Sequence, residues 1–173
     1  MPAAARWAAD ALICDAANAL LAARLAPGQV LALYAAKGSE VATQRIDQAA
    51  RAAGLVVAYP RINPVARLLA FHTVEPAALA PSRFGLREPS ADAPRIAVDK
   101  IAAFVVPGLA FDRGGGRIGW GRGHYDATLA VASPAALRIG LGYERLLVDQ
   151  VPREAHDELL HVIITEVATH MVA

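Results

Sequence analysis

The chain has 173 residues, a length that suits one compact domain, residues 1–173, with its own hydrophobic core. Its 17 lysines and arginines nearly balance its 16 aspartates and glutamates, so the net charge of +1 provides no broad positive field for nucleic acid. Mean hydropathy is +0.35, but alanine supplies much of it, and no apolar run approaches the ~20 residues of a membrane span. We therefore expect a soluble protein with neither nucleic-acid nor membrane partners.

The N-terminal region predicts an alanine-rich helix that runs to Leu25 and is ended by Pro27 and Gly28. Asp10 and Asp15 interrupt its apolar stretch, so we expect no secretory signal and a cytoplasmic location. Cys14 is the only cysteine, which excludes an intramolecular disulfide and a thiolate zinc cluster. We expect it to be a small buried hydrophobic residue.

A strand is predicted over residues 30–34, and a second helix follows it. Ser39 is placed to cap that helix, which should run through Ala53 and stop at Gly54. The apolar residues 55–58 then form the next strand. This order is that of a β-α-β unit.

Short apolar strands continue along the rest of the chain, and a proline-rich segment, residues 76–94, is predicted to be a long surface loop that lines a site. Alternating helices and strands indicate an α/β fold with a largely parallel sheet flanked by helices. Ligands of such sheets bind at the carboxyl ends of the strands. The later predicted strands cover residues 68–71, 101–106, 137–141 and 162–164.

The most informative segment follows the strand at 101–106. Gly114, Gly115 and Gly116 indicate a turn, after which glycines alternate with other residues at 119, 121 and 123. Glycines leave backbone N–H groups uncovered, and uncovered N–H groups can hold phosphate oxygens. A flexible glycine hairpin is the alternative interpretation.

Charged residues accompany these glycines and favour phosphate binding over the hairpin alternative. Arg117 and Arg122 flank the alternating glycines with guanidinium groups suited to phosphate. His124, Tyr125 and Asp126 lead into an apolar helical pattern, so an anion would lie near a helix N-terminus. The Walker pattern is absent, and the glycine spacing fits the dinucleotide fingerprint poorly.

Residues 107–126 resemble the signature of the 5-formyltetrahydrofolate cyclo-ligase family, P-G-[LV]-[AG]-F-D-x-x-G-x-R-[LI]-G-x-G-x-G-[YH]-Y-D. Residues 38–43, 84–89 and 151–166 are similar to further elements of that family. Together these segments extend the resemblance over roughly residues 30 to 166.

The resemblance implies a single-domain α/β fold of the NagB/RpiA/CoA-transferase-like kind. It also implies ATP-dependent cyclisation of 5-formyltetrahydrofolate to 5,10-methenyltetrahydrofolate, with ADP and phosphate released. ATP would be the co-substrate, Mg²⁺ the cofactor, and the protein a monomer or weak homodimer.

The same resemblance implies four sets of site residues. The catalytic residues are Glu40, Arg117 and Arg122; those that bind ATP are Arg117, Ile118, Gly119, Trp120, Gly121, Arg122, Gly123, His124 and Tyr125; those that bind the folate are Ala35, Glu40, Phe84 and His124; those that bind the metal are Asp126 and Asp157.

The residue types alone leave simpler roles open for several of these positions. Glu40 has the spacing of a solvated glutamate in the first turn of a helix, Phe84 that of a core residue, and Asp126 that of a helix cap. Asp112 is expected to be structural, capping the glycine turn. No histidine spacing indicates a transition-metal site.

One departure from the family keeps other functions open. The family usually has a lysine- and arginine-rich N-terminal helix that contacts ATP, whereas only Arg6 and Arg24 precede the first strand here. We therefore expect either weakened nucleotide binding or a truncated start. One alternative is a divergent folate- or nucleotide-binding protein without turnover. A second is a sugar-phosphate isomerase or acyl-transfer enzyme on the same kind of scaffold.

Overall fold

The computed structural model describes residues 1–63 and 65–172, and the side chain of Phe84 also lies outside the described part. Eight strands form one sheet. In sheet order these are β13 (Thr169–Met171), β12 (Val162–Ile164), β10 (Leu137–Leu141), β7 (Ile101–Val106), β1 (Val30–Ala32), β2 (Val56–Ile62), β3 (Leu69–Thr73) and β6 (Arg95–Ile96).

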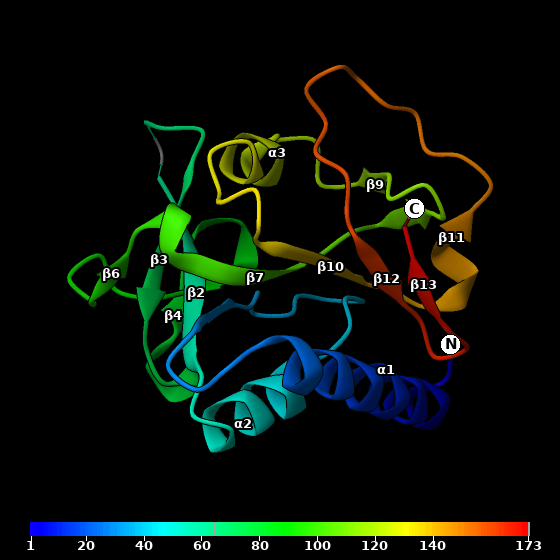
Figure 1. Cartoon of the computed structure of the whole chain (residues 1–173), viewed down its shortest axis with the longest axis horizontal. Coiled ribbons are helices and arrows are strands. Elements are labelled where there is room, and N and C mark those ends of the chain that lie inside the picture. Colours follow the sequence, from blue (N-terminus) through cyan, green and yellow to red (C-terminus); the bar gives the residue numbers. More distant parts are fainter. Residues whose placement is uncertain (64, 173) are drawn as a thin grey trace.

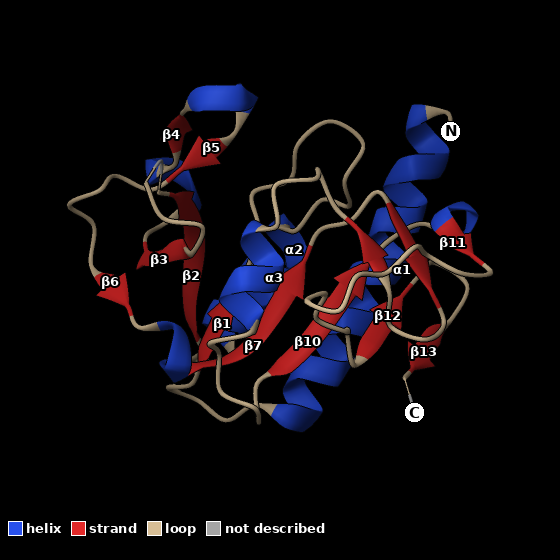
Figure 2. Ribbon diagram, turned by 90° about the horizontal axis from the view of Figure 1, so that it is seen from above, coloured by secondary structure: helices blue, strands red, loops and turns tan. Residues whose placement is uncertain are grey.

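The middle of the sheet is parallel, as the sequence predicts. Strands β12, β10, β7, β1 and β2 all run in one direction, and Figure 2 shows most of them side by side. The edge strands β13 and β6, and β3 next to β6, are antiparallel to their neighbours. Strand β3 follows β2 after only six residues, 63–68, which are too few for the crossover that parallel strands require and so favour the antiparallel direction.

Helices α1 (Ala3–Arg24) and α2 (Gln44–Ala52) cover one face of the sheet, and α3 (His124–Leu129) lies on the other (Figure 1). The predicted end of the first helix is confirmed, because α1 stops at Arg24, before Pro27. Its buried residues recur at helical spacing and form one apolar stripe against the sheet. The stripe consists of Ala9, Ile13, Cys14, Ala17 and Leu21.

Alternation along the strands divides the core between the two faces. Ala103 and Val105 of β7 pack in the cluster that contains the α1 stripe, whereas Phe104 packs in the cluster of the α3 face. There Phe104 meets Phe71 edge to face, with 5.6 Å between ring centroids. Both faces of the central strands are therefore buried, which is why these strands are continuously apolar.

Cys14 is fully buried in the α1 face, as expected for a small apolar residue. Burial, with a smaller contribution from Asp10, raises the pKa of its thiol to about 11. The Sγ–H group donates to the carbonyl oxygen of Ala42 at 3.2 Å. Such a thiol is unreactive at neutral pH.

The predicted start of the second helix is wrong. Helix α2 begins at Gln44, and Ser39 lies in the preceding loop. The residues before Gln44 are held in a non-helical conformation because Tyr34 Oη donates to Val41 O and Thr43 Oγ1 donates to Tyr34 O. The predicted stop is correct, since the chain leaves the helix at Ala53 and Gly54 has φ +78°.

The segment 76–94 is more ordered than the predicted surface loop. It contains the antiparallel pair β4 (Ala80–Pro81) and β5 (Arg87–Glu88), with the 3-10 turns Pro76–Ala78 and Arg83–Gly85. Glu88 is buried, and its Oε1 accepts a hydrogen bond from Ile62 N at 2.9 Å, which fixes β5 to β2. Prolines have no backbone N–H group to donate, so they limit the strand pairing in this segment to β4 and β5.

A second, three-stranded sheet carries the glycine segment. Strand β8 (Ala110–Asp112) pairs with β9 (Arg117–Ile118) and with β11 (Leu147–Val148). Further 3-10 turns occur at Val98–Lys100 and Glu144–Leu146. None of the helices in the described residues has the length and hydropathy needed to span a bilayer.

The order of the strands also predicts where a ligand binds. The chain builds β2 on one side of β1 and then returns to the other side of β1 to build β7. The loops after β1 and β7 therefore diverge and leave a crevice at the carboxyl edge of the sheet.

Candidate active site

A cavity of about 710 Å³ opens at this edge of the sheet. Its size is in the range of small-molecule and cofactor sites. Every predicted site residue with a described side chain lines it. These are Ala35, Glu40, Arg117, Ile118, Gly119, Trp120, Gly121, Arg122, Gly123, His124, Tyr125, Asp126 and Asp157.

The turn that precedes the glycine loop is anchored by Asp112. The Asp112 side chain is 2% exposed, and its Oδ1 accepts hydrogen bonds from Gly114 N and Gly116 N, both at 2.9 Å. Oδ2 accepts from Val151 N at 2.8 Å, and Arg153 donates to Oδ1 at 2.6 Å. The predicted structural role of Asp112 is confirmed.

Burial alone would raise the pKa of Asp112. The hydrogen bonds from Arg153, Val151 and Gly116 favour the ionised form more strongly and lower the pKa to about 2. The carboxylate is therefore ionised at neutral pH, and the turn is fixed at the base of the loop.

The glycine loop, residues 119–123, is open at Gly121 and Gly123, whereas a side chain at Gly119 would come within 2.6 Å of Arg117 Nη1. Gly121 has φ +76°, and a side chain built there would meet no atom within 4 Å. Gly121 is exposed, and Gly123 immediately precedes α3 without a side-chain cap. The loop therefore presents backbone to the cavity, as a phosphate cradle requires.

Arg117 and Asp126 form a partly buried ion pair at the cavity wall. Arg117 Nη2 lies 3.1 Å from both carboxylate oxygens of Asp126, and the Arg117 side chain is 6% exposed. Its Nε is buried with no hydrogen-bond partner in the described part of the chain. The pair argues against Asp126 as a helix cap, since its carboxylate accepts from Arg117 instead.

Tyr125 packs beside this pair. The Arg117 guanidinium lies 5.6 Å from the centroid of its ring. Burial raises the pKa of Tyr125, although the positive charge of Arg117 lowers it, so the phenol is protonated at neutral pH.

Glu40 is held by its own loop and by the glycine loop. Its Oε2 accepts from Lys37 N at 2.8 Å, and its Oε1 accepts from Trp120 Nε1 at 3.2 Å. Lys37 Nζ lies 5.6 Å from the centroid of the Trp120 ring, which is 63% exposed as a residue. Because α2 begins only at Gln44, Glu40 is not in a helical first turn, and that alternative is wrong.

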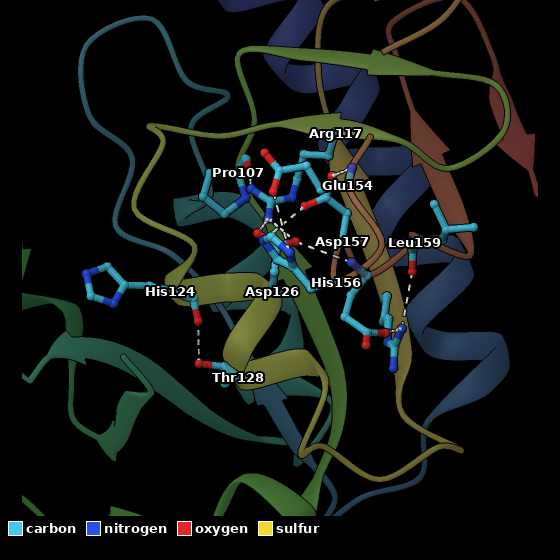
Figure 3. Close-up of polar contacts among 11 residues, drawn as sticks. Pro107, Arg117, His124, Asp126, Thr128, Glu154, His156, Asp157 and Leu159 are labelled. Carbon is cyan, nitrogen blue, oxygen red and sulfur yellow. Dashed lines mark hydrogen bonds and ion pairs between the residues drawn. The ribbon is translucent and has the colours of Figure 1, made fainter. Parts of the chain in front are cut away.

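The other predicted folate residues are placed differently. Ala35 lies three residues beyond the end of β1 and lines the cavity. His124 begins α3, its Nδ1 lies 2.8 Å from Arg67 O, and its ring points away from the Arg117–Asp126 pair (Figure 3). Phe84 is in the turn Arg83–Gly85, and its side chain lies outside the described residues.

Asp157 lies near Asp126 on a loop between β11 and β12 (Figure 3). Its Oδ2 accepts a hydrogen bond from Glu154 N at 2.7 Å, and its Oδ1 is 4.0 Å from His156 Nε2. The described residues contain no group of three metal-binding side chains. Two carboxylates at one cavity nevertheless fit a Mg²⁺ that takes its remaining ligands from phosphate and water.

Several residues that line the cavity are absent from the sequence-based set, and two charged ones among them adjoin the predicted site. Glu88 and Lys37 line the cavity, and Glu88 is only 8% exposed. Local spacing gives no signal for either, because Glu88 reaches the cavity through a ribbon that was predicted to be a loop. An acidic residue beside a proline in a polar segment is ordinarily solvated.

Comparisons with known proteins show which family the chain resembles over most of its length. The model of the 5-formyltetrahydrofolate cyclo-ligase family matches residues 14–166. A cyclo-ligase from Mycolicibacterium smegmatis is 37% identical over 91 residues, which cover 52% of this chain and 47% of that protein. One from Haemophilus influenzae is 27% identical over 138 residues, covering 78% of this chain and 74% of that protein.

A solved structure also resembles the fold. The NMR structure of 5,10-methenyltetrahydrofolate synthetase from Aquifex aeolicus superposes with a TM-score of 0.82 at 23% identity. The match covers 99% of this chain and 85% of that chain. The two proteins therefore share a fold over nearly all of this chain.

Proposed function

Because the chain belongs to the 5-formyltetrahydrofolate cyclo-ligase family, we propose that it closes 5-formyltetrahydrofolate to 5,10-methenyltetrahydrofolate at the expense of ATP, with release of ADP and phosphate. The observation that carries the proposal is the open glycine loop, which shares one cavity with the Arg117–Asp126 pair and Glu40. Phosphate-binding and folate-binding candidates are thus neighbours.

ATP is needed because an amide oxygen is a poor leaving group. Transfer of the γ-phosphoryl group to the formyl oxygen would make that oxygen a leaving group. The anilino nitrogen of the folate then attacks the formyl carbon, the ring closes, and phosphate departs. Phosphoryl transfer depends mainly on positioning and on neutralising charge.

The glycine loop supplies groups for both requirements. Amides of residues 119–123 would hold phosphate oxygens, and Arg122, which is exposed at the cavity, would neutralise their charge. Arg117 is already paired with Asp126, so it would add its buried Nε–H donor and hold Asp126 in place. Pre-placed donors need no reorganisation when charge develops.

Asp126 and Asp157 would hold Mg²⁺ together with phosphate oxygens. Hard oxygen ligands suit this ion, which supplies charge screening of the triphosphate when it is bound. Arg117 donates to both oxygens of Asp126, whereas Asp157 Oδ1 has a contact of 4.0 Å with His156 Nε2. Asp157 is therefore the better ligand.

Glu40 would act on the folate. Its carboxylate accepts from Trp120 Nε1 at one oxygen and from Lys37 N at the other, so each oxygen has a second lone pair with which to accept a substrate N–H group. In that position it can orient the folate or accept a proton. Ala35, Phe84 and His124 would complete the folate side. We also propose that residues 1–173 act as one domain in the cytoplasm, as a monomer or weak homodimer.

The test is turnover with and without ATP. Purified protein, Mg²⁺ and 5-formyltetrahydrofolate should produce the absorbance of the methenyl product only when ATP is added, with one ADP formed per product. A folded protein that binds folate or ATP but gives no product would contradict turnover and support the binding-protein alternative.

A matched pair of arginine variants tests the phosphate side. Arg122→Ala should raise the KM for ATP about ten-fold, because it removes a charge next to the triphosphate. Arg113→Ala, at an exposed arginine outside the cavity, is the control and should leave KM unchanged. Equal KM values for both variants would remove Arg122 from the ATP site.

A further inference from the structure

Arg6 of α1 reaches across to the loop that carries Glu40. Its Nη2 donates to the carbonyl oxygens of Gly38 and Glu40, at 2.8 and 2.9 Å. Its Nε donates to Tyr143 Oη at 3.1 Å. One guanidinium group therefore joins the first helix to the loops after β1 and β10.

The tyrosine in this network is fixed in turn by the same helix. Tyr143 is buried, and its hydroxyl donates to Asp10 Oδ1 at 2.6 Å. Burial and the Asp10 hydrogen bond raise the pKa of Tyr143 to about 12, although Arg6 lowers it. The hydroxyl thus stays protonated, accepting from Arg6 and donating to Asp10, which lies one helical turn further along α1.

The part of the loop that Arg6 contacts lies at the surface, ahead of the buried Val41. Gly38 and Ser39 are exposed, and no helix or strand begins until Gln44. Glu40 N donates to Lys37 O, and the Glu40 carboxylate accepts from Lys37 N, so both of these bonds are internal to the loop. The Arg6 hydrogen bonds tie the backbone of Glu40 itself to α1, whereas Cys14 of the same helix reaches the loop two residues further on, at Ala42 O.

We propose that Arg6 is a positioning residue, which acts through Glu40 by fixing the backbone from which the Glu40 carboxylate enters the cavity. The proposal rests on the proposed function, in which Glu40 handles the folate. Arginine is required because its planar group makes the hydroxyl and carbonyl bonds at once, which an ammonium group at the end of a flexible chain does not reproduce. Small displacements of a positioning group can lower rates strongly.

The test compares Arg6→Ala and Arg6→Lys with Arg24→Ala, a control at the exposed opposite end of the same helix. Arg6→Ala should lower kcat/KM for 5-formyltetrahydrofolate about ten-fold while the KM for ATP changes less than about two-fold. Arg6→Lys should recover only part of this loss, and Arg24→Ala should match the unmodified protein. A uniform loss in both substrates, or full recovery by lysine, would overturn the proposal.

A double-mutant cycle asks whether Arg6 acts through Glu40. In a Glu40→Gln background, Arg6→Ala should weaken folate binding by less than about two-fold, because the group it positions has already been altered. An equal loss in both backgrounds would contradict the proposal. Folate affinity, measured by calorimetry, serves as the readout even where turnover is low.

Hydrogen exchange separates this proposal from the function on which it rests. Arg6→Ala should accelerate exchange of the amides in residues 38–43 and leave those of β7 and β10 unchanged. Failure of turnover in the unmodified protein would refute the cyclo-ligase function, whereas unchanged exchange would refute the Arg6 anchor. If Arg6→Ala does not fold, Tyr143→Phe, which removes one Arg6 partner and keeps both carbonyl bonds, should give a smaller change in the same amides.

Discussion

Two glycine clusters that lie a few residues apart differ in what their glycines do. At the Asp112 turn, a side chain at Gly115 would come within 2.5 Å of the backbone oxygen of Leu160, and Gly115 N donates to Asp112 O. At the glycine loop, a side chain at Gly121 would meet nothing within 4 Å. Gly115 is needed in the first cluster because neighbouring atoms leave no room for a side chain. At Gly121 in the second cluster there is room for one.

The difference shows that a glycine count alone does not identify a binding loop. Space at Gly115 is occupied by protein, whereas space at Gly121 faces a cavity lined by charged side chains. We therefore expect the Asp112 turn to contribute to stability and the glycine loop to contribute to ligand binding. The predictions below separate these roles, beginning with the largest expected effect.

Removal of Asp112 should damage stability most. Asp112→Ala leaves the buried N–H groups of Gly116 and Val151 without acceptors and Arg153 without its partner. We expect a loss of about 3–5 kcal/mol in the free energy of unfolding. Urea denaturation measures it, with Asp99→Ala, in an exposed pair with Lys100, as the control. A loss below about 1 kcal/mol would contradict the structural role.

Alanine substitution at the two glycines should separate packing from ligand binding. Gly115→Ala combines φ +84° with a backbone clash and should cost about 3 kcal/mol of stability. Gly121→Ala meets only the strain of φ +76° and should cost about 1 kcal/mol.

ATP binding should show the opposite order. Gly121→Ala should weaken it more than Gly115→Ala does in the folded fraction, because the new side chain covers the loop amides. Thermal denaturation and ATP titration of both variants provide the comparison. The same order of effects in both measurements would remove the distinction between the clusters.

Acid should destabilise the protein through the Asp112 turn. The pKa of Asp112 is lowered to about 2 in the folded state from an ordinary value of 3.8, so its stabilisation is present above about pH 4. About 2 kcal/mol should be lost as the pH falls from about 4 to about 2, when the folded state must take up the proton. Asp112→Asn should flatten this part of the stability curve, and an unchanged slope would contradict the assignment.

Replacing Trp120 should have the smallest effect. Trp120→Phe keeps an aromatic ring near Lys37 but removes the N–H that donates to Glu40. We expect the KM for folate to change about two- to three-fold, because an exposed hydrogen bond contributes near the lower limit of the usual range, about 0.5 kcal/mol. Trp7→Phe, on the exposed side of α1, is the matched control. A ten-fold change would show that Trp120 contacts substrate directly.

Much of the fold follows from sequence patterns that are local. The apolar runs at 101–106 and 137–141 become β7 and β10, and the β-α-β order gives the parallel middle of the sheet. The start of α2 does not follow, because tertiary hydrogen bonds from Tyr34 and Thr43 hold the preceding loop away from helix. Local capping preferences are weak against such contacts.

The site likewise has a part that the sequence predicts and a part that it does not. Residues 117–126 are consecutive, so their chemistry is readable as one motif, and the cavity contains them. Arg6 and Tyr143 are separated by 137 residues, and their joint contact with the Glu40 loop has no sequence period or spacing. Side chains that position a site from distant elements are therefore recognised only in three dimensions.

The most direct test of the contrast between the turn and the loop is an ATP–Mg²⁺ titration of ¹⁵N-labelled protein, followed by the backbone amide resonances. The amides of Gly119, Gly121 and Gly123 should shift strongly, while those of Gly114, Gly115 and Gly116 should stay nearly unchanged. Shifts confined to Gly114–Gly116, or no shifts in either cluster at saturating ATP, would contradict the assignment of the glycine loop as the phosphate site.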